Sequence, residues 1–139
     1  MVRILHFSDF HYKKGNDSDF KNIAQKLSES IKGKSLNFVV FSGDLVSKDY
    51  GYDTYKVVYD FLFKPILKGC GLSEERLLIV PGNHDMQRED ELEIIKNGIA
   101  QISTNDDLED FCKSSEQVKL SMNRFKNYNK FIHDKFGKV

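Results

Sequence analysis

Residues 77–85 read Leu-Leu-Ile-Val-Pro-Gly-Asn-His-Asp, and the rest of the chain can be understood around this stretch. Four consecutive apolar residues favour a strand that is buried on both faces, as strands in α/β sheets are. The Pro-Gly pair ends the strand, and Gly82 permits a tight turn because a positive φ is open to it. Loops at the carboxyl ends of such strands carry chemistry, so Asn83, His84 and Asp85 form a candidate functional site.

Two earlier stretches repeat this design. Residues 4–11 form an apolar-rich strand that ends in Asp-x-His, and residues 38–44 form a buried strand that ends in Gly-Asp. The three strand ends lie roughly 30 to 40 positions apart, the spacing that a strand-helix-strand crossover needs. Parallel neighbours would open all three ends on the same edge of the sheet. We therefore expect these side chains to converge: Asp9, His11, Asp44, Asn83 and His84.

Helical periodicity fills the two segments between the strands. Residues 17–33 and 52–67 repeat apolar side chains every three or four positions. Pro65 should kink or end the second helix because it lacks an amide donor, and residues 68–71 should form a loop. The predicted inward faces are Phe20, Ile23, Ala24, Leu27 and Ile31 in the first helix, and Tyr55, Val58, Tyr59, Leu62 and Ile66 in the second.

Length and composition limit the class of protein. A chain of 139 residues with 40% hydrophobic and 30% charged side chains is ordinary for one soluble globular domain. The formal net charge of zero provides no global field that would recruit nucleic acid or an anionic membrane. We see neither a membrane span nor a signal peptide, so no membrane partner is expected. Cys70 and Cys112 are isolated, which favours free thiols in a reducing, cytoplasmic setting.

The chain changes character after the third motif. Residues 88–110 hold eight acidic and two basic side chains, whereas residues 116–139 hold six basic and two acidic ones. The basic segment has helical spacing, with an apolar face at Val118, Met122, Phe125, Ile132 and Phe136. We predict core strands and crossover helices over 1–86 and a helical insertion or cap over 87–139 in the same domain. Solvated helix faces are the plainer alternative.

The chain resembles the calcineurin-like metallophosphoesterase superfamily in three motifs, which are Asp9-x-His11, Gly43-Asp44 and Gly82-Asn83-His84-Asp85. They occur in the family's order, each after a predicted strand, within residues 2–86. The resemblance implies an α/β fold with a mostly parallel sheet and flanking helices. This would be the amino-terminal half of the family's αββα sandwich, followed by a carboxyl-terminal helical segment.

The later motifs of the family have no counterpart in these 139 residues. The resemblance implies a further histidine on a downstream strand and a late Gly-His-x-His. After His84 the sequence holds one histidine, His133, and no Gly-His pair. We therefore expect either the amino-terminal part of a longer enzyme or a degenerate member of the family.

Phosphoester hydrolysis at neutral pH needs an activated water and a way to neutralise the phosphoryl charge, and two divalent metal ions about 4 Å apart supply both. Asp44 suits the carboxylate that bridges the two ions. Asp9 and His11 would complete the protein ligands of the first ion, and Asn83 would bind the second through its carbonyl oxygen. Mixed oxygen and nitrogen ligands suit Mn, Fe or Zn.

By resemblance, His84 is the general acid that reaches the leaving-group oxygen. Asp85 would hydrogen-bond the His84 ring, hold its orientation and raise its pKa. Two more histidines for the second ion would come from outside this segment.

Each motif also has a plainer structural interpretation. Asp-x-His alone is an ordinary surface pair and Gly-Asp alone an ordinary turn, but three such motifs after three strands favour a site. His6 is expected to pack within its strand and His133 to lie on the surface.

Several functions are compatible with these motifs. The expected substrate is a phosphoester, which could be a nucleotide, a cyclic nucleotide, a phosphoprotein or nucleic acid. The nuclease branch of the superfamily shares the opening motifs, and the basic carboxyl-terminal segment gives it weight. The non-catalytic alternative is a truncated module that binds metal weakly and pairs with a complementing chain or a second copy. A truncated sheet would favour such pairing, because it leaves an open edge and an uncovered apolar face.

Overall fold

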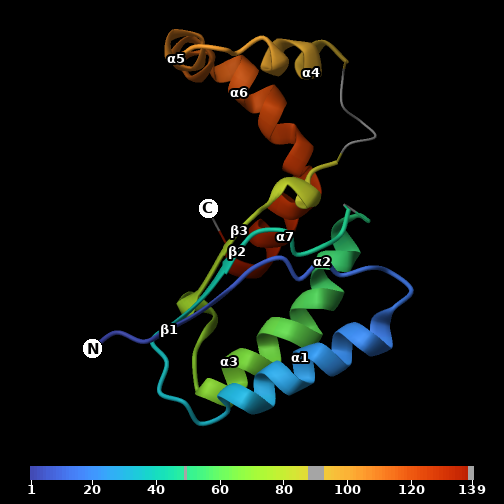
Figure 1. Ribbon diagram of the computed structural model, residues 1–139, viewed down its shortest axis with the longest axis vertical. Coiled ribbons are helices and arrows are strands. Elements are labelled where there is room, and N and C mark those ends of the chain that lie inside the picture. The colour runs from blue at the N-terminus through green and yellow to red at the C-terminus, as the bar shows by residue number, and fades with distance from the viewer. Residues whose placement is uncertain (49, 88–92, 138–139) are drawn as a thin grey trace.

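The computed structural model describes residues 1–48, 50–87 and 93–137 and contains a parallel three-stranded sheet (Figure 1). The strands β1 (Ile4–Phe7), β2 (Phe38–Ser42) and β3 (Leu77–Val80) are hydrogen-bonded in the order β1-β2-β3. With the helices that flank it, this sheet confirms the predicted α/β class. The parallel direction brings the carboxyl ends of all three strands to one edge, as the motif spacing required.

Two helical crossovers join the strands. The helix α1 (Asp17–Ile31) connects β1 to β2. Between β2 and β3 the chain passes through α2 (Tyr52–Val58), a π-helical turn at Tyr59–Phe63 and α3 (Lys64–Cys70), followed by a 3-10 turn at Glu74–Arg76. All three α-helices lie on the same side of the sheet in Figure 1.

The second crossover continues past the proline at which we expected it to kink or end. Pro65 lies in the first turn of α3, and the helix runs on to Cys70, so the loop predicted at 68–71 begins only at Gly71, where φ is 66°. In the π-helical turn, the Lys64 amide donates to the Tyr59 carbonyl five residues back. This wider turn makes room for a proline ring that would otherwise strike a carbonyl of the preceding turn.

The apolar core lies between the sheet and these helices. In α1, Ala24 and Ile31 are buried and Phe20 and Leu27 pack against the core, but Ile23 is 54% exposed, which contradicts its predicted inward position. The whole predicted inward face of the second crossover is buried: Tyr55, Val58, Tyr59, Leu62 and Ile66.

The opposite face of the sheet is open in the part of the chain that the structure describes. Ile4, Leu78 and Val80 are 54%, 53% and 53% exposed. The prediction of burial on both faces is therefore wrong for β3, whereas in β2 Phe38 and Val40 are half-buried. The crossover helices lie on one side of the sheet only, and an exposed apolar face of this kind marks an interaction surface.

The carboxyl-terminal region is helical, as predicted. The helices α4 (Glu93–Ala100), α5 (Asn105–Lys113) and α6 (Ser115–Met122) form an arm that extends beyond the carboxyl end of β3 (Figure 1). After a 3-10 turn at Asn123–Phe125, the helix α7 (Lys126–Phe136) returns to the core. Residues 88–92 of the predicted acidic stretch lie outside the described residues.

The helix α7 confirms part of the predicted apolar face, since Ile132 and Phe136 pack against the core, but its most buried residues are others. Tyr128 and Phe131 are its buried residues, and the Tyr128 hydroxyl donates to the Ile79 carbonyl of β3 at 3.0 Å. Phe131 stacks on Tyr55 with ring centroids 5.8 Å apart. Met122, at the end of α6, is 47% exposed, so the predicted apolar face does not hold there.

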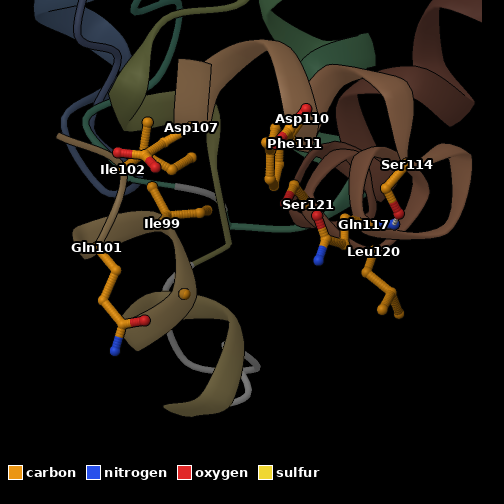
Figure 2. A pocket seen from close by; sticks show the side chains of 11 residues that line it. Ile99, Gln101, Ile102, Asp107, Asp110, Phe111, Ser114, Gln117, Leu120 and Ser121 are labelled. Atoms are coloured by element: carbon orange, nitrogen blue, oxygen red, sulfur yellow. Dashed lines mark hydrogen bonds between the residues drawn. The ribbon is translucent and has the colours of Figure 1, made fainter. Parts of the chain in front are cut away.

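A groove of about 630 Å³ lies within the arm, between α4, α5 and α6 (Figure 2). Its apolar lining includes Ile99, Ile102, Phe111 and Leu120, and none of the six predicted site residues borders it. Among the described residues, no helix has the length and apolar character needed to cross a membrane.

Candidate metal centre

The loops after β1 and β2 continue the parallel pairing of the strands beyond their ends. The Asp9 amide donates to the Gly43 carbonyl and the His11 amide to the Asp44 carbonyl, both at 3.0 Å. An isolated bridge between Tyr12 and Val46 extends the pairing further. The Asp-x-His and Gly-Asp motifs are therefore held side by side by backbone hydrogen bonds.

Three predicted metal ligands adopt the left-handed backbone conformation. Asp9, His11 and Asp44 have φ values of 56°, 48° and 59°, and they are the non-glycine residues with positive φ in the described part of the chain. This conformation costs a residue with a Cβ atom about 1 kcal/mol or more. Its concentration at the three positions that carry donor side chains supports a functional reason for the strain.

Replacing Asp9 with glycine should stabilise the protein, because the Asp9 side chain is largely exposed and glycine adopts this conformation without strain. We expect the free energy of unfolding of the metal-free Asp9→Gly chain to rise by about 1 kcal/mol in urea titrations. The matched change Asp19→Gly in α1 should instead lower it by roughly 0.5 to 1 kcal/mol. Equal losses in both variants would show that the Asp9 backbone is not strained.

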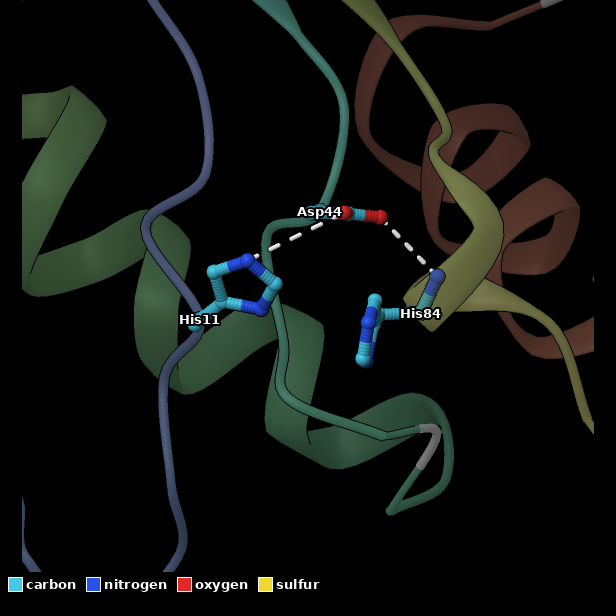
Figure 3. Close-up of side chains that lie close together, drawn as sticks. All are labelled: His11, Asp44 and His84. Atoms are coloured by element: carbon cyan, nitrogen blue, oxygen red, sulfur yellow. Dashed lines mark hydrogen bonds and ion pairs between the residues drawn. The ribbon is translucent and has the colours of Figure 1, made fainter.

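The donor atoms of this site lie close together (Figure 3). His11, Asp44 and His84 each present a ligand atom, and these three atoms lie within 4.8 Å of one another. The His11 Nε2 atom is 3.5 Å from Asp9 Oδ1 and 3.8 Å from Asp44 Oδ2. The structure thus brings four of the predicted residues together at the edge of the sheet.

These distances fit a transition-metal ion. With donor bonds of about 2.1 Å, one ion can hold two donor atoms that are up to about 4.2 Å apart. Both separations from His11 Nε2 fall inside this limit. The donors are one imidazole and two carboxylates, a mixed set of the kind that suits Mn, Fe or Zn. Asp9, His11 and Asp44 would hold such an ion.

The loops after β2 and β3 are in backbone contact. The His84 amide donates to Asp44 Oδ1 at 2.9 Å. A Cβ atom built on Gly82 would lie 2.1 Å from Asp44 Oδ1 and 2.5 Å from the Asp44 amide nitrogen. The φ of Gly82 is −108°, so the positive φ that is open to glycine is not used here. Glycine is required there because the Asp44 carboxylate occupies the space of a side chain.

The His84 ring is oriented by a backbone carbonyl. Its Nδ1 atom lies 2.8 Å from the Ser47 carbonyl oxygen, which can only accept, so Nδ1 carries the proton and donates. The ring also meets His11 edge to face, with centroids 4.7 Å apart. Nε2 is then the atom that can exchange a proton with a substrate. Sequence reasoning missed Ser47, because a carbonyl partner leaves no side-chain signal.

Asp85 does not play the part we predicted for it. Its side chain is 0% exposed, and its carboxylate accepts hydrogen bonds from the backbone amides of Leu45, Val46 and Gly82. The expectation that Asp85 hydrogen-bonds the His84 ring is wrong, since the Ser47 carbonyl occupies Nδ1. Burial raises the pKa of the Asp85 carboxyl above its usual range, while the three amide bonds act in the opposite direction.

Three further predictions concern side chains that are exposed in the structure. Asn83 begins the 3-10 turn at Asn83–Asp85 and is exposed, and its role as a metal ligand stays a prediction. His6 is exposed rather than packed, and its Nε2 lies 2.8 Å from Ser42 Oγ on the open face of the sheet. His133 lies on the surface of α7, as expected.

Comparison with known proteins gives the family. The chain matches the family model of calcineurin-like phosphoesterases over residues 2–136. This chain therefore belongs to the calcineurin-like phosphoesterase family.

A relative in Bacillus subtilis (strain 168), the uncharacterized metallophosphoesterase-like protein YydB, is 32% identical over 92 residues. That match covers 63% of this chain but only 18% of the relative's length.

Proposed function

We propose that this chain contributes the first half of a dinuclear metal centre that hydrolyses phosphoesters. The observation that carries the proposal is the meeting of Asp9, His11, Asp44 and His84 at one sheet edge, with three of them in a strained backbone conformation. Asp44 would bridge two ions, Asp9 and His11 would complete the first, and Asn83 would bind the second. Metal ions held by these residues would supply an activated water and neutralise phosphoryl charge.

His84 would protonate the leaving group in this proposal. The Ser47 carbonyl supports that role, because it accepts from Nδ1–H, fixes the orientation of the ring and leaves Nε2 as the atom that can exchange a proton with the substrate. Asp85 takes no direct part in the proton transfer, since its carboxylate is buried among backbone amides.

The remaining donors of the second ion would come from outside residues 1–139. The open apolar face of the sheet supports this part of the proposal, because Ile4, Leu78 and Val80 need a covering layer. That layer would be supplied by more of the same polypeptide, a complementing chain or a second copy. If no layer is supplied, the chain is the non-catalytic module that binds metal weakly.

The position of the carboxyl-terminal helices indicates to which domain they belong and which class of substrate is preferred. We treat residues 87–139 as a helical cap of the same domain, because α7 packs on α2 and on β3. Lys130 lies over the Tyr52 ring at 4.5 Å, and Lys135 pairs with Glu74 at 2.7 Å, so both lysines face their own chain. Two of the six basic side chains that favoured the nuclease alternative therefore contact their own chain, and we prefer a phosphomonoester or phosphodiester of a small molecule as the substrate. A cytoplasmic location completes the proposal.

Metal content and hydrolysis, measured together, test this function. Elemental analysis of the purified chain should find bound transition metal. Bis-p-nitrophenyl phosphate and p-nitrophenyl phosphate, each with added Mn²⁺, report diesterase and monoesterase activity. Two ions per chain with turnover would mean that the missing donors are supplied by association. One ion without turnover would support the half-site, and failure to bind any metal would overturn the proposal.

The His84→Asn change distinguishes a role of His84 as general acid from a role as metal ligand. If His84 acts as the acid, turnover of the active assembly should fall by about 10²- to 10⁴-fold while metal content stays within about twofold. The measurement is kcat together with metal content in the same preparation. A large loss of bound metal would instead make His84 a metal ligand, which its position within the donor cluster permits.

A further inference from the structure

The buried carboxylate of Asp85 joins two loops that are far apart in the sequence. It accepts from the Leu45 and Val46 amides, both at 3.2 Å, and from the Gly82 amide at 2.9 Å. Leu45 and Val46 directly follow Asp44, and Gly82 comes two residues before His84. A single side chain therefore spans the loop after β2 and the loop after β3.

Asp85 is itself held from the helical side of the sheet. The buried Tyr55 hydroxyl of α2 donates to the Asp85 carbonyl at 3.1 Å. Of the three amide bonds to the Asp85 carboxylate, the one from Gly82, at 2.9 Å, has the length of a charge-assisted hydrogen bond. The residue thus ties both loops to the core below the site.

We propose that Asp85 is a positioning residue, which sets the distance between Asp44 and His84 through these backbone amides. The inference rests on the proposed metal centre, because it assigns Asp85 the task of aligning that centre's donors. Residues that orient metal ligands from outside the coordination shell affect affinity by about 10- to 100-fold when changed. Asp85 takes this role without touching the metal or the substrate.

The test compares Asp85→Asn with Asp107→Asn. An asparagine at 85 keeps the shape but directs an NH₂ group at amides that also donate. Asp107 is the matched control, since its carboxylate accepts from the Ser103 and Thr104 amides in the arm, at 3.2 and 2.9 Å. The readouts are the Mn²⁺ dissociation constant, the melting temperature and hydrogen exchange of the His84 amide.

The expected result is specific to Asp85→Asn. Mn²⁺ affinity should fall by about 10- to 100-fold. The His84 amide, which donates to Asp44 Oδ1, should exchange faster relative to the amides of α1. Asp107→Asn should keep the Mn²⁺ affinity and the exchange rate of the His84 amide within about twofold of the wild type. Unchanged affinity and exchange in Asp85→Asn, or losses that Asp107→Asn shares, would overturn the proposal and leave Asp85 a structural residue.

A milder pair of variants applies if circular dichroism shows that Asp85→Asn does not fold. Tyr55→Phe removes the hydroxyl that holds Asp85, and Tyr128→Phe removes the comparable bond to the Ile79 carbonyl in β3. Weaker Mn²⁺ binding and faster His84 exchange in Tyr55→Phe alone would support positioning, and equal effects would refute it. If wild-type chain binds no Mn²⁺, the proposed function fails, and His84 amide exchange alone decides the role of Asp85.

Discussion

An Asp44→Asn chain should bind Mn²⁺ at least 100-fold more weakly than the wild type, and the active assembly should lose about three orders of magnitude in kcat/KM, roughly 4 kcal/mol. Asparagine keeps the size of the side chain and tolerates the left-handed backbone at φ 59°, so the loop should retain its course. What disappears is the negative charge and one metal-binding oxygen. Calorimetric Mn²⁺ titration and hydrolysis assays measure the two losses.

A matched control separates the role of Asp44 from a general effect of removing charge. Asp53→Asn removes an exposed carboxylate in the first turn of α2 and should leave Mn²⁺ binding unchanged. If Asp44→Asn turned over substrate normally at saturating metal, the assignment of Asp44 as the bridging ligand would be wrong.

The Gly82→Ala change should produce the largest structural effect of any single methyl group at this site. The added Cβ would stand 2.1 Å from Asp44 Oδ1 and 2.5 Å from the Asp44 amide nitrogen, so the two loops must separate. Overpacking against backbone costs about 3 kcal/mol or more, and the displaced carboxylate should lose Mn²⁺ binding with it. Because the φ of Gly82 is −108°, backbone strain contributes nothing to this loss.

Gly98→Ala is the control for Gly82→Ala. Gly98 lies in α4, and a Cβ atom there would meet nothing within 4 Å. Alanine should therefore stabilise the helix by roughly 0.5 to 1 kcal/mol without altering Mn²⁺ affinity. Urea unfolding of both variants should show a lower free energy of unfolding for Gly82→Ala and a higher one for Gly98→Ala. Similar free energies of unfolding for Gly82→Ala and wild type would mean that the loops are not in contact.

The strands and the crossover helices could be predicted because their signals are local. Apolar runs at 38–41 and 77–80 mark strands, and a 3.6-residue period marks the helices, whatever the rest of the chain does. Predictions failed where the outcome depends on distant residues. Leu78 and Val80 are exposed because nothing described covers their face, and α3 passes Pro65 because a π-helical turn relieves the clash.

The candidate site, too, could be predicted from the sequence only in part. Convergence of Asp9, His11 and Asp44 followed from strand order, since parallel strands open on one edge. The hydrogen-bond partners of each side chain could not be predicted from the strand order. Asp85 is adjacent to His84 in the sequence, yet its carboxylate turns into the core toward amides some 40 residues away. Neighbours in a 3-10 turn point in different directions, so adjacency is a poor guide to contact.

By itself, then, the sequence determined the parallel α/β architecture, the family and the residues that meet at the sheet edge. These depend on residue type and spacing along one chain. Tertiary structure alone decided that Ser47 orients His84, that Gly82 makes room for Asp44 and that Asp85 joins the two loops. Each of these contacts involves a backbone group, and every residue has the same backbone groups, so only the three-dimensional course of the chain selects which ones meet.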